Sequence, residues 1–223
     1  MVTMNNSSTT IEGPAGDLEV MMERPRQQAA VSRVAVIGHP HPLMEGTMHN
    51  KVVHSLARYY RDQGLVSVRF NFRGVGKSQG EHAQGAGEVE DFITVCQWAA
   101  AQYPNAAFDV AGFSFGSYVA LAAARSLAQQ GWSILSVLLV APPIERMAFE
   151  ALSIESPLRK VPLVVVQGDV DEVVSAQQTV HWFENWQGIK RLFTVSEAGH
   201  FFHSKLATLK APVEACVNQD WVE

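Results

Sequence analysis

The stretch of this sequence that decides the fold is Phe108-Asp109-Val110-Ala111-Gly112-Phe113-Ser114-Phe115-Gly116, which is followed by an alanine-rich segment at residues 117–125. Its apolar beginning is short and follows turn residues at Pro104-Asn105, so it predicts a buried strand. Alanine is the best helix former, so residues 117–125 predict a helix. The pentapeptide Gly112–Gly116 is therefore expected to form a strand-to-helix turn with Ser114 at its apex.

The G-x-S-x-G pattern of this turn has a mechanical reason. A serine on so sharp a turn adopts a strained backbone conformation. Glycine at positions 112 and 116 removes the Cβ atoms that would clash there. The helix that follows directs unpaired N–H groups toward the serine hydroxyl. The pattern thus favours a serine nucleophile over a chance turn.

Composition and charge indicate a globular protein. The 223 residues are 47% hydrophobic and 17% charged, which suits one domain with a substantial core, and we predict a single domain over residues 1–223 with residues 1–9 disordered. The net charge is −5 and no basic run is present, so nothing indicates nucleic-acid binding. No apolar stretch approaches the roughly 18 residues that span a bilayer, so no membrane association is predicted.

The two cysteines and the N-terminus point to a cytoplasmic location. Residues 1–10 are polar and lack the layout of a signal peptide. Cys96 and Cys216 lie far apart, each inside a predicted helix, which favours two free buried thiols in a reducing compartment over a disulfide. The sequence specifies no oligomeric state.

Strands and helices alternate along the chain. Two short strands around a Gly/Pro turn in residues 10–22 predict an antiparallel hairpin at a sheet edge. Further strands are predicted at 33–38, 65–71, 108–111, 134–141, 163–167 and 191–195, and helices at 48–62, 87–102, 117–125, 175–186 and 203–218. This alternation predicts a doubly wound α/β fold with a mostly parallel sheet covered on both faces.

The connection between two of these strands bears on access to any site. Only 21 residues separate Ala141 from Leu163, too few for a folded cap domain. A site on this sheet is therefore expected to be open.

Loops after the last two strands supply candidates for an acid and a base. A serine nucleophile needs a base, and the base needs a group that holds its tautomer. In a parallel sheet such groups lie in loops at the carboxyl ends of strands. Gly168-Asp169-Val170-Asp171-Glu172 follows one strand, and Ser196–His203, which contains His200, follows the next. The order serine, acid, histidine is the one this architecture uses.

These motifs resemble those of a known superfamily. The pentapeptide at 112–116, Gly168-Asp169-Val170-Asp171 and Ala198-Gly199-His200-Phe201-Phe202 are similar to motifs of the α/β-hydrolase superfamily. His39-Pro40-His41-Pro42 with Gly46-Thr47-Met48 and the stretch from Arg69 to Gly80 resemble a small, cap-less bacterial group of predicted hydrolases. The resemblance covers residues from about 10 to 210.

The resemblance implies roles for particular residues. Ser114 is the implied nucleophile, Asp171 the acid and His200 the base. An oxyanion hole is implied from the Phe115 N–H and from one N–H after the strand at 33–38. No cofactor or metal is needed.

For the second oxyanion donor, the sequence leaves two positions open. Pro40 and Pro42 have no N–H and are excluded. Leu43 fits best if His41-Pro42 stands where relatives have His-Gly, and His41 is the alternative. Relatives usually have glycine at position 45, where this chain has Glu45.

The acid and the base have neighbouring rivals. Asp169 and Glu172 flank Asp171, and Asp169 is expected to bond local backbone in its turn. His203 lies where the last helix is predicted to begin, whereas His200 lies on a loop that can reach over the sheet. We therefore assign the acid to Asp171 and the base to His200.

Two other kinds of site are disfavoured. His39 and His41 at strand spacing, with His200 and His203, suggest a metal site, but the prolines bend the run and no Asp or Cys completes a zinc pattern. The segment Gly74-Val75-Gly76-Lys77-Ser78 imitates a phosphate-binding loop, but position 71, where that pattern needs glycine, is asparagine. A tight turn beside the active site is expected there, and the two histidines at 39 and 41 are expected to brace their loop.

The predicted function is that of a serine hydrolase acting on a small-molecule carboxylic ester or thioester through an acyl-enzyme on Ser114. A non-catalytic member of the same fold is the alternative, and a peptidase is less expected because no gating domain accompanies the fold. Four phenylalanines, Phe113, Phe115, Phe201 and Phe202, flank the serine and the histidine. Most are expected in the core, with one or two lining an apolar acyl pocket.

Overall fold

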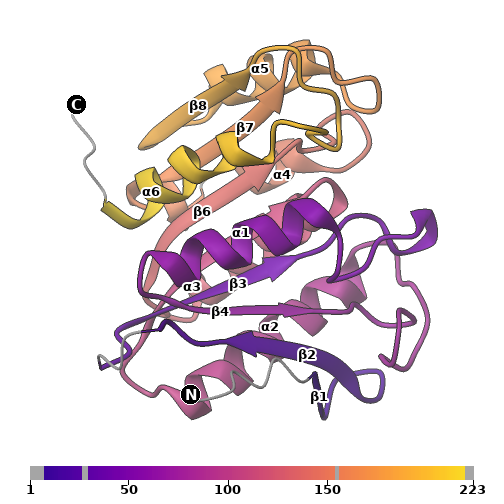
Figure 1. The fold of residues 1–223 in the computed structure, drawn as a ribbon, viewed down its shortest axis with the longest axis vertical. Helices are drawn as coiled ribbons and strands as arrows, with labels where there is room; N and C mark the ends of the chain where they lie inside the picture. The colour runs from indigo at the N-terminus through magenta and orange to yellow at the C-terminus, as the bar shows by residue number, and fades with distance from the viewer. Residues whose placement is uncertain (1–7, 27–29, 154–155, 219–223) are drawn as a thin grey trace.

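The computed structural model describes residues 8–26, 30–153 and 156–218. Its centre is one twisted sheet with helices on both faces (Figure 1). In spatial order the strands are β1 (Thr9–Ile11), β2 (Leu18–Glu23), β4 (Val66–Phe70), β3 (Arg33–Gly38), β5 (Ala107–Phe113), β6 (Ile134–Val140), β7 (Leu163–Gly168) and β8 (Lys190–Val195). The first two are antiparallel to their neighbours and the others run parallel. The predicted mostly parallel sheet with an antiparallel edge hairpin is confirmed.

The helices form two layers. In Figure 1, α1 (Lys51–Asp62) and α6 (Lys210–Asn218) lie in front of the sheet. The other face is covered by α2 (Ala86–Gln102) and α3 (Phe115–Gln129), with α4 (Phe149–Ser153) and α5 (Ala176–Asn185) beside them. Each face has its own hydrophobic cluster, and β3 contributes to both, because successive side chains of a strand point to opposite faces.

The order of the strands creates a crevice at their carboxyl ends. β3 pairs with β4 on one side and with β5 on the other, so the chain leaves β3 and β5 in opposite directions. In such a sheet the loops after these two strands diverge and leave room for a ligand. The loop that begins at His39 and the turn at Ser114 therefore meet at this point of the sheet.

Two predicted boundaries differ from the observed ones. The last helix was expected at 203–218, but α6 begins at Lys210 after a short 3-10 turn, Leu206–Leu209. Phe202 and Ser204 have φ angles of 51° and 60°, a left-handed conformation that an α-helix cannot contain. At the other end, residues 1–7 lie outside the described residues. Thr9 was expected to be disordered, but it belongs to β1 and pairs with Val20 of β2.

The two cysteines behave as the sequence predicts. Cys96 and Cys216 are both buried and free. Burial raises the pKa of both thiols, that of Cys216 to about 12. Thiols with such pKa values are inert toward ordinary electrophiles, so these side chains act as small apolar core residues.

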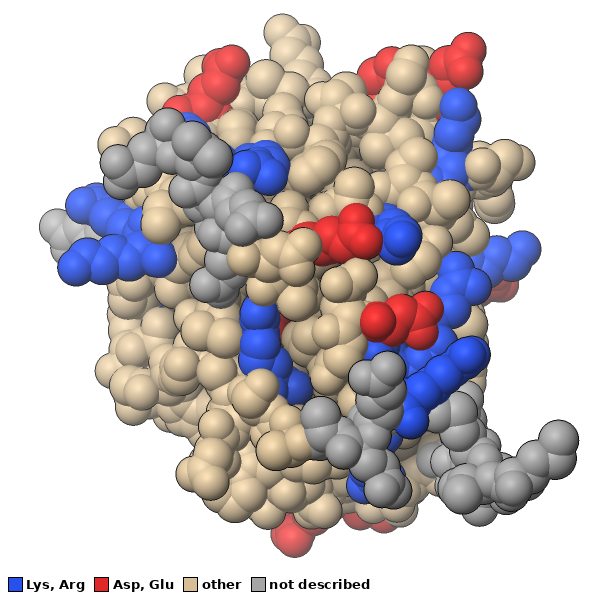
Figure 2. Space-filling view, turned by 60° about the vertical axis from the view of Figure 1, so that its left-hand side comes forward, with Lys and Arg blue, Asp and Glu red and all other residues tan. Residues whose placement is uncertain are grey.

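The charged surface has no single sign on the face shown in Figure 2, where Lys and Arg side chains are interspersed with Asp and Glu and separated by uncharged areas. None of the described helices is long and apolar enough to cross a membrane.

Candidate active site

Ser114 lies on the turn between β5 and α3, with φ 53° and ψ −123°. This is a left-handed conformation that non-glycine residues rarely adopt, and it marks a functional turn. A Cβ atom at Gly112 would overlap the carbonyl oxygen of Gly116, and one at Gly116 would lie 2.5 Å from the oxygens of Gly38 and His39. The two glycines of the pentapeptide are therefore required by the close approach of backbone to backbone.

The loops after β7 and β8 bring an aspartate and a histidine to this serine. His200 Nε2 lies 3.0 Å from Ser114 Oγ, and His200 Nδ1 lies 2.9 Å from Asp171 Oδ2. The imidazole of His200 is almost completely buried, with 3% of the side chain exposed, and the Asp171 side chain is fully buried. The three residues that the sequence nominated thus form one continuous chain of hydrogen bonds.

The Asp171 carboxylate is held by its own turn. Its Oδ1 accepts hydrogen bonds from the backbone N–H groups of Val173 and Val174, both at 2.9 Å, and its Oδ2 accepts one from Gln167 Nε2 at 3.2 Å. Burial by itself raises the pKa of Asp171, but the hydrogen bonds from His200 and from these two N–H groups outweigh it and the pKa lies below its usual value. An ionised carboxylate in this position fixes the Nδ1–H tautomer of His200.

The rival residues have other partners. Asp169 Oδ1 accepts the backbone N–H of Glu197 at 2.7 Å, so it ties the β7 and β8 loops together. Glu172 Oε2 accepts the backbone N–H of His200 at 3.3 Å and thereby supports the loop rather than the imidazole. His203 is exposed and its ring contacts Phe201.

His39 braces the loop after β3. It is fully buried, and its Nδ1 donates to the carbonyl oxygen of Pro40 at 2.6 Å while its Nε2 accepts the N–H of Phe72 at 3.0 Å. Burial lowers the pKa of His39 to about 3, so the ring is neutral. With both ring nitrogens engaged, His39 cannot serve as a base or a metal ligand.

The two candidate oxyanion donors, Leu43 and His41, are placed differently relative to the cavity at Ser114. The Leu43 N–H donates to His41 Nδ1 at 3.2 Å, and the Leu43 side chain is 71% exposed and does not line the cavity at Ser114. His41 does line that cavity, and within the described residues neither its N–H nor that of Phe115 has a hydrogen-bond acceptor. The geometry therefore favours the alternative, His41, over Leu43, because the turn at Pro42–Met44 directs the Leu43 N–H back into the loop.

The same loop carries the one departure from the family pattern. Glu45 has φ 59° and ψ 20°, a left-handed conformation in which glycine costs nothing and other residues cost energy. Gly46, which follows it, sits so close to Pro40 that an added Cβ would overlap the Pro40 carbonyl. The loop thus keeps a glycine-like backbone at position 45 although the residue is glutamate.

Ser114 opens into a cavity of about 490 Å³. Its walls are largely apolar and include Met44, Phe115, Pro143, Met147 and Phe201. Among the four phenylalanines singled out in the sequence, Phe113 and Phe202 are core residues, as expected for most of them, while Phe115 and Phe201 face this cavity. A cavity of this size and character suits a small organic group.

Sequence reasoning missed a pair formed by His82 and the buried Glu88 beside the loop after β3. Glu88 is fully buried at the start of α2, where it accepts the N–H groups of Ala83 and Gly85 at 2.8 and 2.7 Å. His82 Nδ1 lies 2.9 Å from Glu88 Oε1, and the His82 ring lies 4.8 Å from that of His41. The only signal was a glutamate three residues after Gly85, the spacing of a helix N-terminal cap.

The His82 ring packs against the rings of both His41 and Phe115. Its centroid lies 5.6 Å from that of Phe115, and the rings of His41 and Phe115 are 4.9 Å apart. The three rings therefore contact one another beside the cavity that His41 and Phe115 line.

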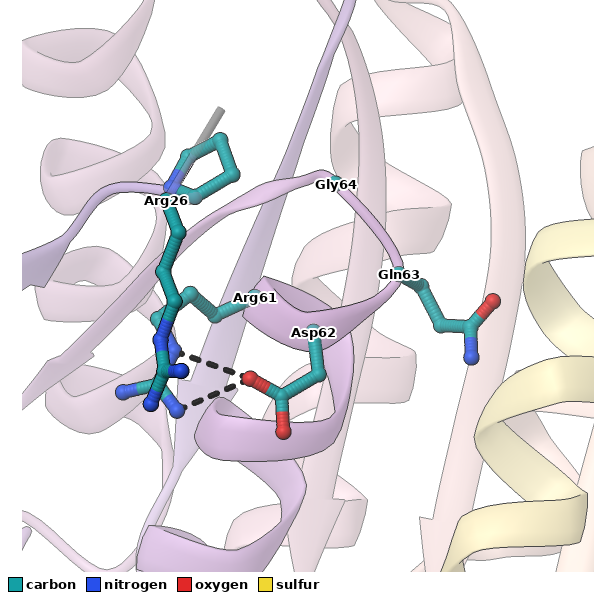
Figure 3. Close-up of a pocket in the computed structure, with 6 residues that line it drawn as sticks. Arg26, Arg61, Asp62, Gln63 and Gly64 are labelled. Carbon is teal, nitrogen blue, oxygen red and sulfur yellow. Dashed lines mark hydrogen bonds and ion pairs between the residues drawn. The ribbon is translucent and has the colours of Figure 1, made fainter. Parts of the chain in front are cut away.

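A hollow of similar size, about 500 Å³, lies where α1 ends and β2 leaves the sheet (Figure 3). Figure 3 shows Arg61 turned toward Asp62, with which it pairs at 2.9 Å, and Arg26 beside it. Arg61 also pairs with Glu23 at 2.8 Å. The lining contains no nucleophile, so this hollow is not a candidate for catalysis.

The segment that imitates a phosphate-binding loop is closed by its own hydrogen bonds. The Lys77 N–H donates to Glu19 Oε2 and the Ser78 N–H donates to the Val75 carbonyl, both near 3 Å. The Gly74 N–H donates to the Gln79 carbonyl at 3.0 Å. These N–H groups are not available to a phosphate. Within the described residues, no group of three His, Cys, Asp or Glu side chains is arranged to hold a metal ion.

Comparison with known proteins places the chain in a family. A family model described as X-Pro dipeptidyl-peptidase (S15 family) matches residues 16–136, more than half of the sequence. A solved α/β serine hydrolase without a lid, from Xanthomonas campestris, is 35% identical with a TM-score of 0.84, covering 97% of this chain and 95% of its own. The chain belongs to the α/β serine hydrolases.

Two further relatives extend this assignment. An α/β serine hydrolase homologue from Coxiella burnetii is 38% identical with a TM-score of 0.83, covering 99% of this chain and 100% of its own. An uncharacterized protein of Rickettsia prowazekii is 34% identical over 199 residues, which are 86% of this chain and 81% of that protein. The resemblance stated from the motifs is confirmed at the level of the superfamily and of its lidless members.

In this α/β serine hydrolase the connection between β6 and β7 stands where a lid would be. Its described part contains only α4 and a 3-10 turn, Pro157–Lys160, and three of its residues, Pro143, Arg146 and Met147, form one wall of the cavity. The Arg146 guanidinium donates to the Val173 carbonyl at 2.6 Å and so links this wall to the turn that carries Asp171.

Proposed function

We propose that this hydrolase cleaves a carboxylic ester or thioester through an acyl-enzyme on Ser114. The observation that carries the proposal is the chain of hydrogen bonds Ser114–His200–Asp171, with spacings of 3.0 and 2.9 Å, which ends at an apolar cavity. An isolated serine is a weak nucleophile, and an adjacent base with an oriented tautomer is what activates it.

In the proposed first step, Ser114 Oγ attacks the acyl carbon while His200 Nε2 takes the hydroxyl proton. The bond from the acyl carbon to the leaving oxygen or sulfur then breaks, and His200 gives its proton to that atom. In the second step water attacks the acyl-enzyme, with His200 again as the base, and Ser114 recovers its proton. Asp171 stays ionised throughout and stabilises the imidazolium.

The oxyanion is proposed to be held by two backbone N–H groups, those of Phe115 and His41. Phe115 is the first residue of α3, so its N–H also carries the positive end of the helix dipole. Removing one such donor from a hydrolase costs about 10²–10³ in kcat, so their orientation is expected to contribute substantially to the rate.

The remaining assignments are proposed with it. We infer a small-molecule substrate, because the cavity of about 490 Å³ lies in the open and the β6–β7 connection carries no lid in its described part. All described strands belong to one sheet, which supports a single domain. The two free buried thiols support a reducing, cytoplasmic compartment.

The test is covalent labelling with a fluorophosphonate, followed by intact and peptide mass measurement. One adduct is expected on Ser114 and none in the Ser114→Ala variant. Ser196→Ala, which removes an exposed serine from the loop that carries His200, is the matched control and should label like the wild type. A folded wild-type protein that takes no label would overturn the proposal and favour a non-catalytic binding protein.

Hydrolysis assays then separate the classes of acyl substrate. Esters and thioesters with short acyl chains are expected to turn over. An amide of an X-Pro dipeptide, the substrate type suggested by the matched family description, serves as the competing arm. Turnover of the amide without turnover of either ester class would replace our proposal by a peptidase.

A further inference from the structure

The cavity at Ser114 continues along α1 through two further hollows. The neighbouring hollow, of about 300 Å³, shares Glu45, Asn50 and Phe201 with the catalytic cavity. A third, of about 430 Å³, shares His49 and Lys51 with the second. Together they make a path from the nucleophile along the exposed side of the helix.

This path is lined by cationic and titratable side chains of α1. Lys51, His54 and Arg58 stand at positions i, i+3 and i+7 and therefore lie on one face of the helix, and all three are exposed. With a rise of about 1.5 Å per residue, Lys51 and Arg58 lie about 10 Å apart along the axis. We call this face, together with His49 and His203 beside it, the α1 groove.

Among the described residues, Lys51 and Arg58 of the groove have no carboxylate partner. Within the described residues, no Asp or Glu lies within 4.0 Å of the Lys51 ammonium or the Arg58 guanidinium, which contacts the ring and hydroxyl of Tyr59 instead. In contrast, Arg61, which follows Arg58 by three residues on α1, and Arg69 of β4 both pair with Glu23. Glu45 is the one carboxylate among the residues that line the three hollows, so Lys51 and Arg58 leave a net positive charge along the path, in a chain whose net charge is −5.

The α1 groove begins on the side of the catalytic cavity where the leaving group of a substrate is expected to lie. His200 must give a proton to the leaving atom, so the leaving group lies next to the His200 imidazole. Phe201, the following residue, lines both the catalytic cavity and the neighbouring hollow, and His203 lines the latter. The acyl group is then placed against the opposite, apolar wall of the cavity, which Pro143 and Met147 form.

We infer that the α1 groove binds a leaving group that carries phosphate, and that the substrate is therefore an acyl thioester of a phosphate-bearing thiol such as coenzyme A. The inference rests on the proposed function and selects among its substrates. The cations begin beside the site and extend about 10 Å along the helix, so the phosphates must lie at the far end of an extended leaving group. Chemically, the C–S bond breaks, Ser114 keeps the acyl group, and the thiol sulfur takes the proton from His200.

Two thioesters with the same acyl group test this inference. Butyryl-CoA carries phosphates, whereas S-butyryl-N-acetylcysteamine keeps the same reacting atoms and lacks them. We expect kcat to be similar for both and KM to be at least tenfold lower for butyryl-CoA at low salt, with the difference shrinking in 0.5 M NaCl because salt screens exposed charges.

Charge reversals locate the effect. Lys51→Glu and Arg58→Glu are each expected to raise KM for butyryl-CoA about tenfold and to leave both parameters for the neutral thioester unchanged. A negative residue at position 51, the first of α1, favours the helix, so the fold is not at risk. Lys160→Glu, the same change in the 3-10 turn before β7, is the matched control and should behave like the wild type.

The outcomes separate this inference from the proposed function. Equal KM values for the two thioesters would overturn phosphate binding in the α1 groove and leave the proposed hydrolase function standing. The same holds if Lys51→Glu and Lys160→Glu change the KM for butyryl-CoA by the same factor. If no acyl compound is cleaved, calorimetry of free coenzyme A with the Ser114→Ala variant decides. Binding that Arg58→Glu abolishes supports the groove without hydrolysis, and no binding at millimolar coenzyme A overturns it.

Discussion

The two ends of the parallel sheet each bury a carboxylate, with opposite consequences. At the carboxyl ends of the strands, Asp171 hydrogen-bonds a histidine that reaches a serine at an open cavity. Toward the amino ends, Asp109 is fully buried and pairs with Arg33 through two bonds of 2.6 and 2.9 Å, while Ser136 donates to the same carboxylate. We propose the first arrangement as the catalytic triad, whereas the second fastens β3, β5 and β6 together.

The partners explain the difference. Burial raises the pKa of Asp109 above its usual value, although the Arg33 guanidinium and Ser136 oppose it. Arg33 is a permanent cation, so no proton can move along this network, and it also donates to the carbonyl oxygens of Cys216 and Val217 at the end of α6. Asp171 instead faces an imidazole, whose proton can be exchanged. The role of each buried carboxylate therefore depends on the group with which it is paired.

The largest expected effect separates activity from stability at the catalytic end. Asp171→Asn should lower kcat for an ester by about 10⁴-fold, because an amide cannot fix the tautomer or stabilise the imidazolium of His200. The free energy of unfolding should change little, since the amide oxygen can still accept the N–H groups of Val173 and Val174. Steady-state kinetics and urea denaturation measure the two quantities. An Asp171→Asn variant with wild-type activity would show that another carboxylate acts as the acid.

The reverse pattern is expected at the other end. Asp109→Asn should lower the free energy of unfolding by about 3–5 kcal/mol, because it leaves the Arg33 guanidinium without its counter-charge. The kcat of the folded fraction should stay within about threefold of the wild type, since Asp109 lies outside the residues that line the catalytic cavity. Urea denaturation monitored by tryptophan fluorescence gives the first value. A variant of full stability and low activity would erase the contrast between the two networks.

A third test measures how the free energy of unfolding depends on pH, which reports on His39 in the loop after β3. The folded protein holds His39 neutral with a pKa of about 3, whereas the unfolded chain binds a proton there near pH 6.5. The free energy of unfolding should therefore fall as the pH falls below 6.5, by about 1.4 kcal/mol per pH unit. The depressed pKa values of His41 and His54 act in the same direction.

The His39→Gln variant isolates this contribution. The loss of stability between pH 7 and pH 5, measured by urea denaturation, should be about 2 kcal/mol smaller than in the wild type. An unchanged pH dependence would show that His39 is not the buried neutral group that the loop requires.

The smallest expected effect concerns the ring that packs on the oxyanion donors. His82→Ala should lower kcat about tenfold with little change in KM, because His41 and Phe115 lose a neighbour that orients their N–H groups. The affinity for a trifluoromethyl ketone, which forms an oxyanion on Ser114, should fall in parallel. His82→Phe keeps a ring and should restore most of the rate. A change in KM alone would indicate that His82 only shapes the cavity.

The sequence determined the architecture because strands, helices and turns depend on short-range patterns, and the same patterns with the family resemblance nominated the three residues of the proposed triad. Apolar runs separated by helical segments predicted the sheet, and G-x-S-x-G between a strand and a helix predicted the strained turn at Ser114. The loop after β7 carried a candidate for the acid and the loop after β8 a candidate for the base, in the chain order serine, acid, histidine. The boundary of α6 was missed because the left-handed residues Phe202 and Ser204 have no sequence signature.

Only the tertiary structure decided the features that join distant segments. The favoured oxyanion donor, His41 rather than Leu43, depends on how the Pro42–Met44 turn directs each N–H, which the spacing of prolines does not show. The pair of Arg33 and Asp109 joins residues 76 positions apart. Local pattern fixes which residues lie on a strand, a turn or a helix, because backbone geometry is set by neighbours in the chain. Packing across the whole sheet decides which of these residues face the same cavity and which charged side chains lie beside it.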